Sequence, residues 1–414
     1  MSKHDYDVVV VGGRVAGGSL ALRLGERGHR VLLIDRDRFP SDTLSTHYMS
    51  PRHVPLLAKL GVLADVEALG FRRITRNRCS FEDCSIEGPL APNGGYALAP
   101  RRDALDQVIV EHATRRGNVK FHDRTVVEGL LRDGERVIGV TLRGKGGERV
   151  EARAKVVVGA DGKYSSVAEW VSAPKYHEVS ALRPAYYGHF RGVAPLPETC
   201  VELFFQRNAI GFLFPMRPGE DCLALEIQPE HWEAFREDPQ ATFRQWFQAL
   251  PGMASRLANA QLDGKLLGVR GVENYFRKPY GMGWALTGDA AYCKDPSTGF
   301  GIGDALSQAF WLADALHAAL EGADWEETMA AYQRQRDEAL LPWYHATLGF
   351  TRAPDASAEA IAWLRAVCSS AGFIRGFVPG IPAALADPKI FPAAAYSRLA
   401  QLAAAFGASG RVPD

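Results

Sequence analysis

The chain has 414 residues, enough for two closely joined domains with a large core. Its 48 Lys and Arg residues balance 48 Asp and Glu residues, so the net charge does not indicate a nucleic-acid partner. The nearest pair of its six cysteines, Cys79 and Cys84, has neither redox CxxC nor zinc spacing. We therefore expect a cytoplasmic protein without a metal. We also expect no integral membrane segment, because no signal peptide precedes the first strand and no apolar run reaches roughly 18 residues.

The first predicted elements form a dinucleotide-binding βαβ unit. Residues 8–11 form a buried parallel strand, a glycine-rich turn follows, residues 19–28 form a helix, and residues 31–34 form a second apolar strand that ends at an acid. In such a unit the glycines permit a tight turn, the helix N-terminus faces a pyrophosphate, and the acid binds ribose hydroxyls. The residues predicted here to contact a cofactor are Gly12, Val15, Ala16, Gly17, Asp35 and Arg36.

Arg14 stands where the usual motif has its second glycine, at the closest approach of the backbone to the phosphates. A guanidinium there either points into solvent or folds over the diphosphate as a bidentate donor. We favour the phosphate contact and include Arg14 among the predicted cofactor residues.

The polar loop that follows, residues 36–47, is a candidate active-site segment because it comes directly after the ribose-binding strand. We predict that Ser41 to His47 lies along the cofactor, with His47 as the candidate catalytic acid–base group. The alternative is structural, with Asp42 or Ser45 capping a helix over about residues 51–60.

Further along, Leu105, Val108, Ile109 and Ala113 recur at helical spacing and predict a helix up to about Arg116. A hairpin and a buried strand ending near Asp161 follow. From residue 183 to 270 strand-like segments dominate and indicate an antiparallel sheet that carries aromatic side chains, suited to covering an apolar substrate. The predicted pocket residues are Phe204, Phe212 and Phe214, with an ordinary sheet core as the alternative for each.

A second glycine-rich turn follows a short strand, residues 284–287, and leads into a helix over about residues 302–320. The free N–H groups and the dipole at the start of this helix can stabilise negative charge.

Together these segments resemble the FAD-dependent oxidoreductases built like para-hydroxybenzoate hydroxylase. Four motifs carry the resemblance over roughly residues 5–340, in the same order as in the family. They are the turn Gly12 to Gly17 with Asp35, the helix start Arg102 to Asp106, the segment Gly159–Gly162, and Gly288-Asp289 with Pro296 to Gly301.

The resemblance implies FAD as the cofactor and assigns residues to it. Asp289 would touch the ribityl chain, and the backbone from Gly299 to Ile302, Gly301 included, would donate near the flavin N1–C2=O edge. Arg102 and Val127 would lie beside the cofactor, and the turn at Asp161 would link the cofactor and substrate domains.

The resulting fold class is α/β, a Rossmann-like FAD-binding domain interleaved with an antiparallel-sheet substrate domain, followed by C-terminal helices. We expect FAD-binding segments at 1–75, 76–182 (with interdomain strands) and 271–340, and the sheet domain at 183–270. The alanine-rich tail, 341–414, is expected to cap the substrate pocket, to form a homodimer contact, or to pack on the chain's own core.

Two departures from the aromatic hydroxylases stand out. These enzymes usually have asparagine where Gly303 stands and aspartate where Gln308 stands. The run from Asp295 looks more like the geranylgeranyl-reductase and halogenase branches. The paired-tryptophan signature of flavin halogenases is absent, since its nearest counterpart is the segment 211–215, and this argues against halogenation.

The leading hypothesis is a monooxygenase that hydroxylates a small aromatic or apolar metabolite, with O₂ as co-substrate and a flavin C4a-hydroperoxide as the oxygen donor. The alternatives are a reductase of isoprenoid-type double bonds and a non-redox cyclase or isomerase that uses flavin structurally. No second strand–glycine–helix unit is present for a pyridine nucleotide. NAD(P)H would therefore bind transiently, or a partner flavin reductase would supply reduced flavin.

Overall fold

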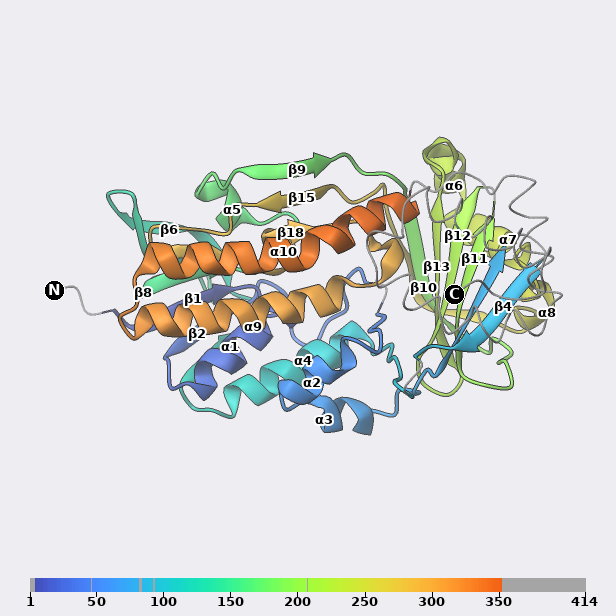
Figure 1. Ribbon diagram of the computed structural model, residues 1–414, viewed down its shortest axis with the longest axis horizontal. Coiled ribbons are helices and arrows are strands. Elements are labelled where there is room, and N and C mark those ends of the chain that lie inside the picture. The colour runs from blue at the N-terminus through green and yellow to red at the C-terminus, as the bar shows by residue number, and fades with distance from the viewer. Residues whose placement is uncertain (1–3, 46, 82–83, 92–93, 207, 352–414) are drawn as a thin grey trace, which may run out of the picture.

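Apolar strands form the central sheet of the larger of two lobes, at the left in Figure 1. The computed structural model describes residues 4–45, 47–81, 84–91, 94–206 and 208–351. The strand order is β16-β17-β8-β1-β2-β5. The bounds are β1 (Tyr6–Val11), β2 (Val31–Ile34), β5 (Val119–His122), β8 (Arg149–Gly159), β16 (Tyr280–Gly281) and β17 (Trp284–Leu286). β1 pairs in parallel with both β2 and β8, so its valines are completely buried and form the centre of the core.

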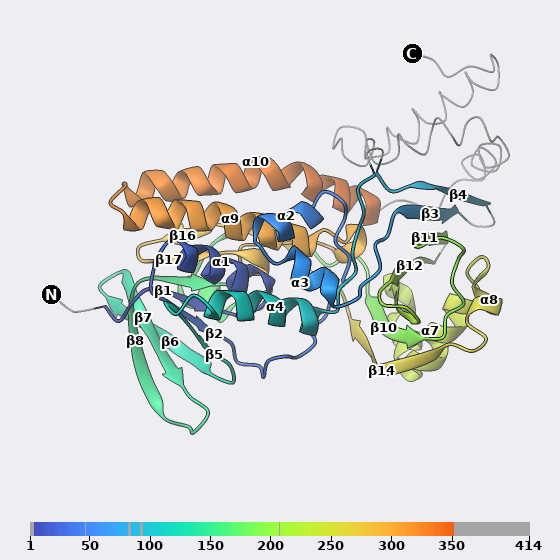
Figure 2. The same ribbon diagram turned by 90° about the horizontal axis from the view of Figure 1, so that it is seen from below.

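Helices cover one face of this sheet, and α9 and α10 run side by side over it (Figures 1 and 2). The helices are α1 (Val15–Glu26), α2 (Val54–Lys59), α3 (Leu63–Ala68), α4 (Arg102–Thr114), α9 (Gly301–Leu320) and α10 (Trp325–Thr351). The hairpin of β6 (Val126–Asp133) and β7 (Arg136–Arg143) packs on the other face with α5 (Ser166–Trp170). A small sheet of β9 (Lys175–Val179), β15 (Asn274–Arg277) and β18 (Tyr292–Cys293) supports the end of α10.

The second lobe is built on a seven-stranded sheet with the order β14-β10-β13-β12-β11-β3-β4. The bounds are β3 (Arg76–Phe81), β4 (Cys84–Pro89), β10 (Ala185–Arg191), β11 (Cys200–Gln206), β12 (Ala209–Pro215), β13 (Glu220–Ile227) and β14 (Gln261–Val269). All neighbours are antiparallel except the parallel pair β3 and β11. α6 (Trp232–Glu237), α7 (Pro239–Gln248) and α8 (Met253–Arg256) cover one face, preceded by the 3₁₀ turn η1 (Pro229–His231).

The expected α/β architecture is confirmed, whereas two expected boundaries are displaced. Residues 76–89 were assigned to the FAD-binding segments, but β3 and β4 extend the second lobe's sheet because β3 pairs along β11. α10 continues through residue 341 to Thr351 without a break, although Pro342 lies inside it. The rest of the predicted C-terminal cap, residues 352–414, lies outside the described residues.

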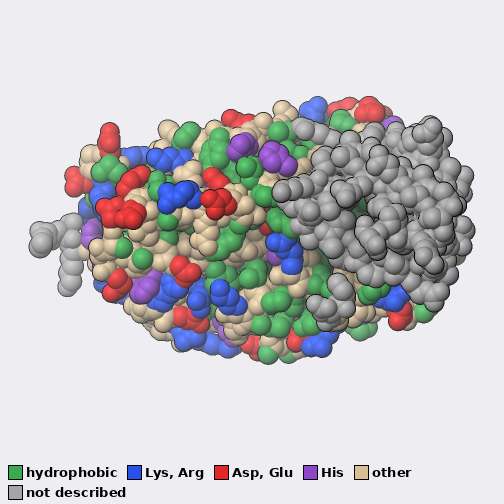
Figure 3. All heavy atoms as spheres, viewed as in Figure 1, with side chains coloured by type: hydrophobic (Ala, Val, Ile, Leu, Met, Phe, Trp, Pro, Cys, Tyr) green, Lys and Arg blue, Asp and Glu red, His purple; other side chains and the backbone are tan. Residues whose placement is uncertain are grey.

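The surface matches the balanced composition. On the face shown in Figure 3, Lys and Arg side chains are interspersed with Asp and Glu across the coloured part. Within the described ranges, no helix is both long and apolar enough to cross a membrane.

Candidate active site

A cavity of about 470 Å³ lies where the parallel sheet of the first lobe meets the sheet of the second. It is lined by the ends of β1, β2 and β8, the starts of α1 and α9, and one face of β10, β12 and β13. Most of the predicted site residues line it: Gly12, Arg14, Val15, Ala16, Asp35, Arg36, Arg102, Val127, Asp161, Phe212, Asp289, Pro296, Gly299, Gly301 and Ile302. Gly17, His47, Phe204 and Phe214 do not.

The first glycine turn is shaped by close backbone contacts. Gly12 has a φ of +107°, and a Cβ there would lie 2.3 Å from the Ala160 carbonyl oxygen. Gly17 packs α1 against the turn, since its Cβ would lie 1.9 Å from the Gly12 oxygen. Gly17 therefore permits helix–strand packing rather than a cofactor contact. No side chain of the described residues caps α1, so the N–H groups at its start are left for a ligand.

Asp35 ties this turn to the neighbouring strand. Its Oδ2 accepts a hydrogen bond from the Gly13 N–H at 2.7 Å, and its Oδ1 accepts one from the Asp37 N–H at 2.8 Å. Burial raises the pKa of Asp35, and these two N–H groups oppose the shift. Because a carboxylate oxygen accepts two hydrogen bonds, each oxygen retains a lone pair for a ribose hydroxyl.

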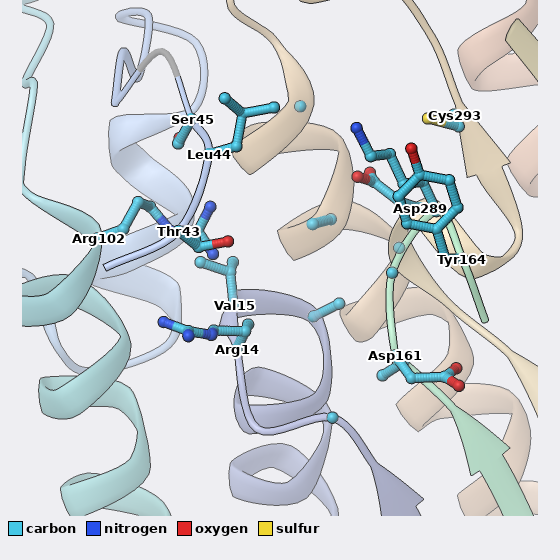
Figure 4. A pocket seen from close by; sticks show the side chains of 18 of the residues that line it. Arg14, Val15, Thr43, Leu44, Ser45, Arg102, Asp161, Tyr164, Asp289 and Cys293 are labelled. Carbon is cyan, nitrogen blue, oxygen red and sulfur yellow. The ribbon is translucent and has the colours of Figure 1, made fainter. Parts of the chain in front are cut away.

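Arg14 was predicted either to point into solvent or to fold over the diphosphate. Its side chain is instead held by acidic side chains of the protein. Its Nη2 lies 3.1 Å from Asp37 Oδ2, and its Nη1 lies 3.3 Å from Asp106 Oδ2. Arg102 contacts the same oxygen of Asp106 at 3.2 Å. Asp106 is completely buried and so fixes two guanidinium groups on one side of the cavity (Figure 4). This role of Asp106 was not predicted from the sequence, although its i,i+4 spacing from Arg102 indicates a pair.

Two further acids lie across the cavity from the arginines (Figure 4). Asp289, in the 3₁₀ turn η2 (Gly288–Ala290), is exposed to the cavity, and its carboxylate accepts no hydrogen bond from the described residues. Asp161 instead serves the local fold. It accepts hydrogen bonds from Ser165 Oγ at 2.5 Å and from the Val167 N–H at 3.3 Å, which secures the start of α5.

The second glycine turn borders the cavity between the 3₁₀ turn η3 (Pro296–Thr298) and α9. Gly299 is left-handed, with a φ of +66°, and a Cβ on it would lie 2.9 Å from Tyr48. No side chain caps α9. The structure also explains why asparagine is absent at Gly303, because a Cβ there would lie 2.1 Å from the His53 ring.

A buried ion pair beside this turn was not anticipated from the sequence. The Lys294 ammonium contacts the Asp304 carboxylate, both groups are buried, and both residues line the cavity. The Lys294 nitrogen also lies 5.2 Å from the centre of the Tyr292 ring. A lysine directly after the apolar residues 290–293 was the available signal, since burying a charge without a partner is costly.

His47 does not occupy its predicted position at the cavity. It is completely buried, with a φ of +59°, and its Nε2 lies 3.1 Å from His189 Nε2. Burial lowers the pKa of His47 well below its usual value, and His189, Arg102 and Arg101 lower it further. Thr43, Leu44 and Ser45 line the cavity instead. Of the segment predicted to lie along the cofactor, these three residues reach the cavity, whereas His47 is buried behind the cavity wall.

The three aromatic residues predicted to line the pocket do not all lie on the same face of the sheet, because side chains alternate between the faces along each strand. Phe212 lines the cavity. Phe214 is on the same face but packs against Tyr48, with ring centres 5.4 Å apart. Phe204 is on the opposite face, where it packs among the residues under α6 to α8. The pocket assignments of Phe204 and Phe214 were therefore wrong.

Comparison with known proteins assigns the fold to a family. A family model described as FAD binding domain matches residues 5–340, and the chain belongs to this family of FAD-dependent oxidoreductases.

Individual relatives are more distant. The chain is 23% identical over 340 residues to a 1H-pyrrole-2-carbonyl-[peptidyl-carrier protein] brominase of Pseudoalteromonas luteoviolacea, covering 79% of this chain and 81% of the relative. It is 27% identical to digeranylgeranylglycerophospholipid reductase of Methanosarcina acetivorans, covering 78% and 77%. The p-nitrophenol 4-monooxygenase PnpA from Pseudomonas putida shares the fold, with a TM-score of 0.75, 20% identity and coverage of 90% and 96%.

The cavity fits an FAD on its own structural evidence. It has two uncapped helix starts, which suit anionic or electron-rich groups. It also has a buried acid after the second strand and an acid without a hydrogen-bond partner at Asp289. Gly288 leaves room beside the turn, because a Cβ on it would lie 2.7 Å from the Ala16 Cβ.

Proposed function

We propose that the protein is an FAD-dependent monooxygenase that hydroxylates a small aromatic or apolar metabolite. The observation that carries the proposal is the continuity of the cavity. The wall formed by the two glycine turns passes directly into an apolar sheet wall that contains Tyr187, Phe212 and Ala224. An apolar substrate on that wall would be held beside the flavin ring and away from bulk water, which oxygen transfer from a reduced flavin requires.

In this proposal, different residues of the chain bind different parts of FAD. Asp35 binds the ribose, Arg14 and Arg102 lie beside the diphosphate, and Asp289 binds the ribityl chain. The start of α9, which no side chain of the described residues caps, places N–H groups and the positive end of its dipole next to the ring, where they stabilise negative charge on the reduced cofactor. FAD supplies the redox chemistry, and either transient NAD(P)H or a partner flavin reductase supplies the electrons.

A hydrogen bond from the ribityl chain to Asp289 predicts the effect of removing this acid. Asp289→Ala should weaken FAD binding by about 1–3 kcal/mol, measured by titrating apoprotein with FAD. Asp314→Ala is the matched control, because Asp314 pairs with Arg27 on the outer side of α9. Equal FAD affinity in the two variants would contradict the assignment of Asp289.

Labelled oxygen tests the reaction class. Holoenzyme is incubated with NADPH, or with NADH and a flavin reductase, under ¹⁸O₂ together with a panel of aromatic and isoprenoid compounds. Products are then analysed by mass spectrometry. One ¹⁸O atom in the product supports the proposal. A product two hydrogens heavier without label indicates a reductase, an isomer of equal mass indicates a cyclase or isomerase, and halide incorporation indicates a halogenase.

A further inference from the structure

Glu226 is an acid in the apolar part of the cavity wall. It is in β13, paired with Ala185 of β10 and Ile210 of β12. By strand alternation it shares a face with Ala224 and Cys222, and this face looks toward the first lobe. Glu226 lines the cavity, yet only 3% of its surface is exposed. It therefore projects from the sheet into the space proposed for the substrate.

This carboxyl group lacks the partners that a buried charge needs. Its Oε2 is buried and has no hydrogen-bond partner among the described residues, and none of their cations lies within ion-pair distance. Burial raises the pKa of Glu226 well above its usual value, Asp295 raises it further, and Arg183 opposes this. An isolated buried carboxylate is costly, so the surroundings of Glu226 favour its protonated form.

The facing residue Asp295 has the same character. It is 1% exposed, and it lines the cavity from η3, next to the second glycine turn. Its Oδ1 accepts a hydrogen bond from the Ser297 N–H at 3.0 Å, whereas its Oδ2 is buried without a partner among the described residues. Two acids with unused oxygens thus border the cavity from the two lobes, between the second glycine turn and the apolar sheet wall.

We propose that Glu226 is a substrate-positioning residue, whose protonated carboxyl group donates a hydrogen bond to an acceptor oxygen of an uncharged, largely apolar substrate. The surrounding wall binds the apolar body, and Glu226 selects a carbonyl or similar oxygen and fixes the orientation of the body. A carboxylate-bearing substrate is disfavoured, because its charge would lose hydration against the apolar wall. The inference rests on the proposed function only in placing an organic substrate in this cavity.

Infrared spectroscopy of the holoenzyme tests the protonation state. At pH 7 the difference spectrum between wild type and Glu226→Gln should contain the C=O stretch of a protonated carboxylic acid. The probe is 2-acetylnaphthalene, and its addition should move this band to lower frequency as the carboxyl group donates to the ketone. The shape-matched 2-isopropenylnaphthalene, which has no acceptor oxygen, should leave the band in place. The absence of the band, or the same response to both probes, would overturn the proposal.

Probe affinities give a second measurement, read from the flavin absorbance change on titration. Wild type should bind the ketone about tenfold more tightly than the alkene, the size of one net hydrogen bond. Glu226→Gln retains an N–H donor and should keep the preference, whereas Glu226→Leu should lose it. An unchanged preference in Glu226→Leu, or failure of wild type to bind either probe, would overturn the assignment.

One control tests whether the Glu226→Gln variant folds and binds flavin, and the ¹⁸O₂ experiment tests the reaction class independently. Flavin content should match wild type in Glu226→Gln, which is isosteric, and thermal unfolding should show no loss of stability. Neither the infrared measurement nor the probe titration requires turnover. A negative ¹⁸O₂ experiment would therefore refute the oxygenase proposal without affecting the role of Glu226, and a negative infrared result would leave the oxygenase proposal intact.

Discussion

The two faces of the seven-stranded sheet differ in whether a buried acid has a partner. On the face under α6 to α8, Phe204, Leu213, Leu223 and Leu225 form an apolar core. By strand alternation Glu202 belongs to the same face, and its charge is balanced by Arg256, whose Nη1 lies 2.8 Å from Oε1 and donates a hydrogen bond to Oε2 at 2.9 Å.

On the cavity face Glu220 is paired with Arg101, whereas Glu226 has no cation of the described residues at ion-pair distance. Glu226 Oε2 is buried without a hydrogen-bond partner in the described part of the chain. Burial there costs free energy that pairing does not return. The difference indicates that one face stabilises the lobe, whereas the other keeps donors and acceptors for a ligand. Each variant below removes one side of this comparison.

The largest effect is expected for Phe204→Ala. Phe204 is 1% exposed and packs edge-on against Phe247, so its removal leaves a cavity in the helix-covered core. The free energy of unfolding should fall by about 3–5 kcal/mol, measured by urea denaturation. The partner experiment is Phe212→Ala, which should change affinity for 2-acetylnaphthalene, whereas Phe204→Ala should not. The reverse pattern would mean that the two faces have been assigned incorrectly.

The next largest effect on stability is expected when the ion pair between Glu202 and Arg256 is broken. Glu202→Gln leaves Arg256 without a full counter-charge and should lower the free energy of unfolding by about 3 kcal/mol. The double variant Glu202→Gln with Arg256→Met should recover part of the loss, because no unpaired charge then remains. Additive losses in the double variant would show that the pair contributes little.

Glu226→Gln, unlike Glu202→Gln, should raise the free energy of unfolding, and the size of the gain should depend on pH. The folded-state pKa of Glu226 lies above its unfolded value, so the wild-type protein loses stability as pH rises from about 4.5 to that folded pKa. The groups that face it are Asp295 and Arg183. The variant should gain stability relative to wild type across this window, by about 1.4 kcal/mol for each unit of pKa difference. Denaturation at several pH values measures the gain, and a pH-independent difference would contradict an unpaired Glu226.

The smallest effect is expected for the His47–His189 contact. Burial lowers the pKa of both rings; Arg101 lowers both further, Arg102 also lowers that of His47, and Asp42 raises that of His189. Stability should therefore be full above about pH 6.5 and fall below it, as the unfolded chain takes up protons. His47→Phe should flatten this slope and leave the pH profile of product formation unchanged. A shifted product profile with FAD still bound would restore His47 as an acid–base group.

Local pattern was sufficient for the cofactor-binding lobe. The strand, glycine turn, helix and acid from Val8 to Asp35 are contiguous in the chain, and each step depends on neighbours in sequence. The second glycine turn before α9 has the same property. The sequence therefore determined the α/β class and the family, and most of the site residues that it predicted line the cavity.

Only the tertiary structure decided which side chains face the cavity. β12 and β13 are buried on both faces, so alternation between apolar and polar residues, which would mark an exposed face, is missing from their sequences. Phe212 of β12 and Phe204 of the neighbouring β11, where Phe205 follows it directly, lie on opposite faces, and no such alternation distinguishes them. Likewise, the partners of Arg14 and of Lys294, and the lack of a partner for Glu226, depend on segments that meet only after folding. For this reason the charge pairing in the cavity wall could not be predicted from local pattern.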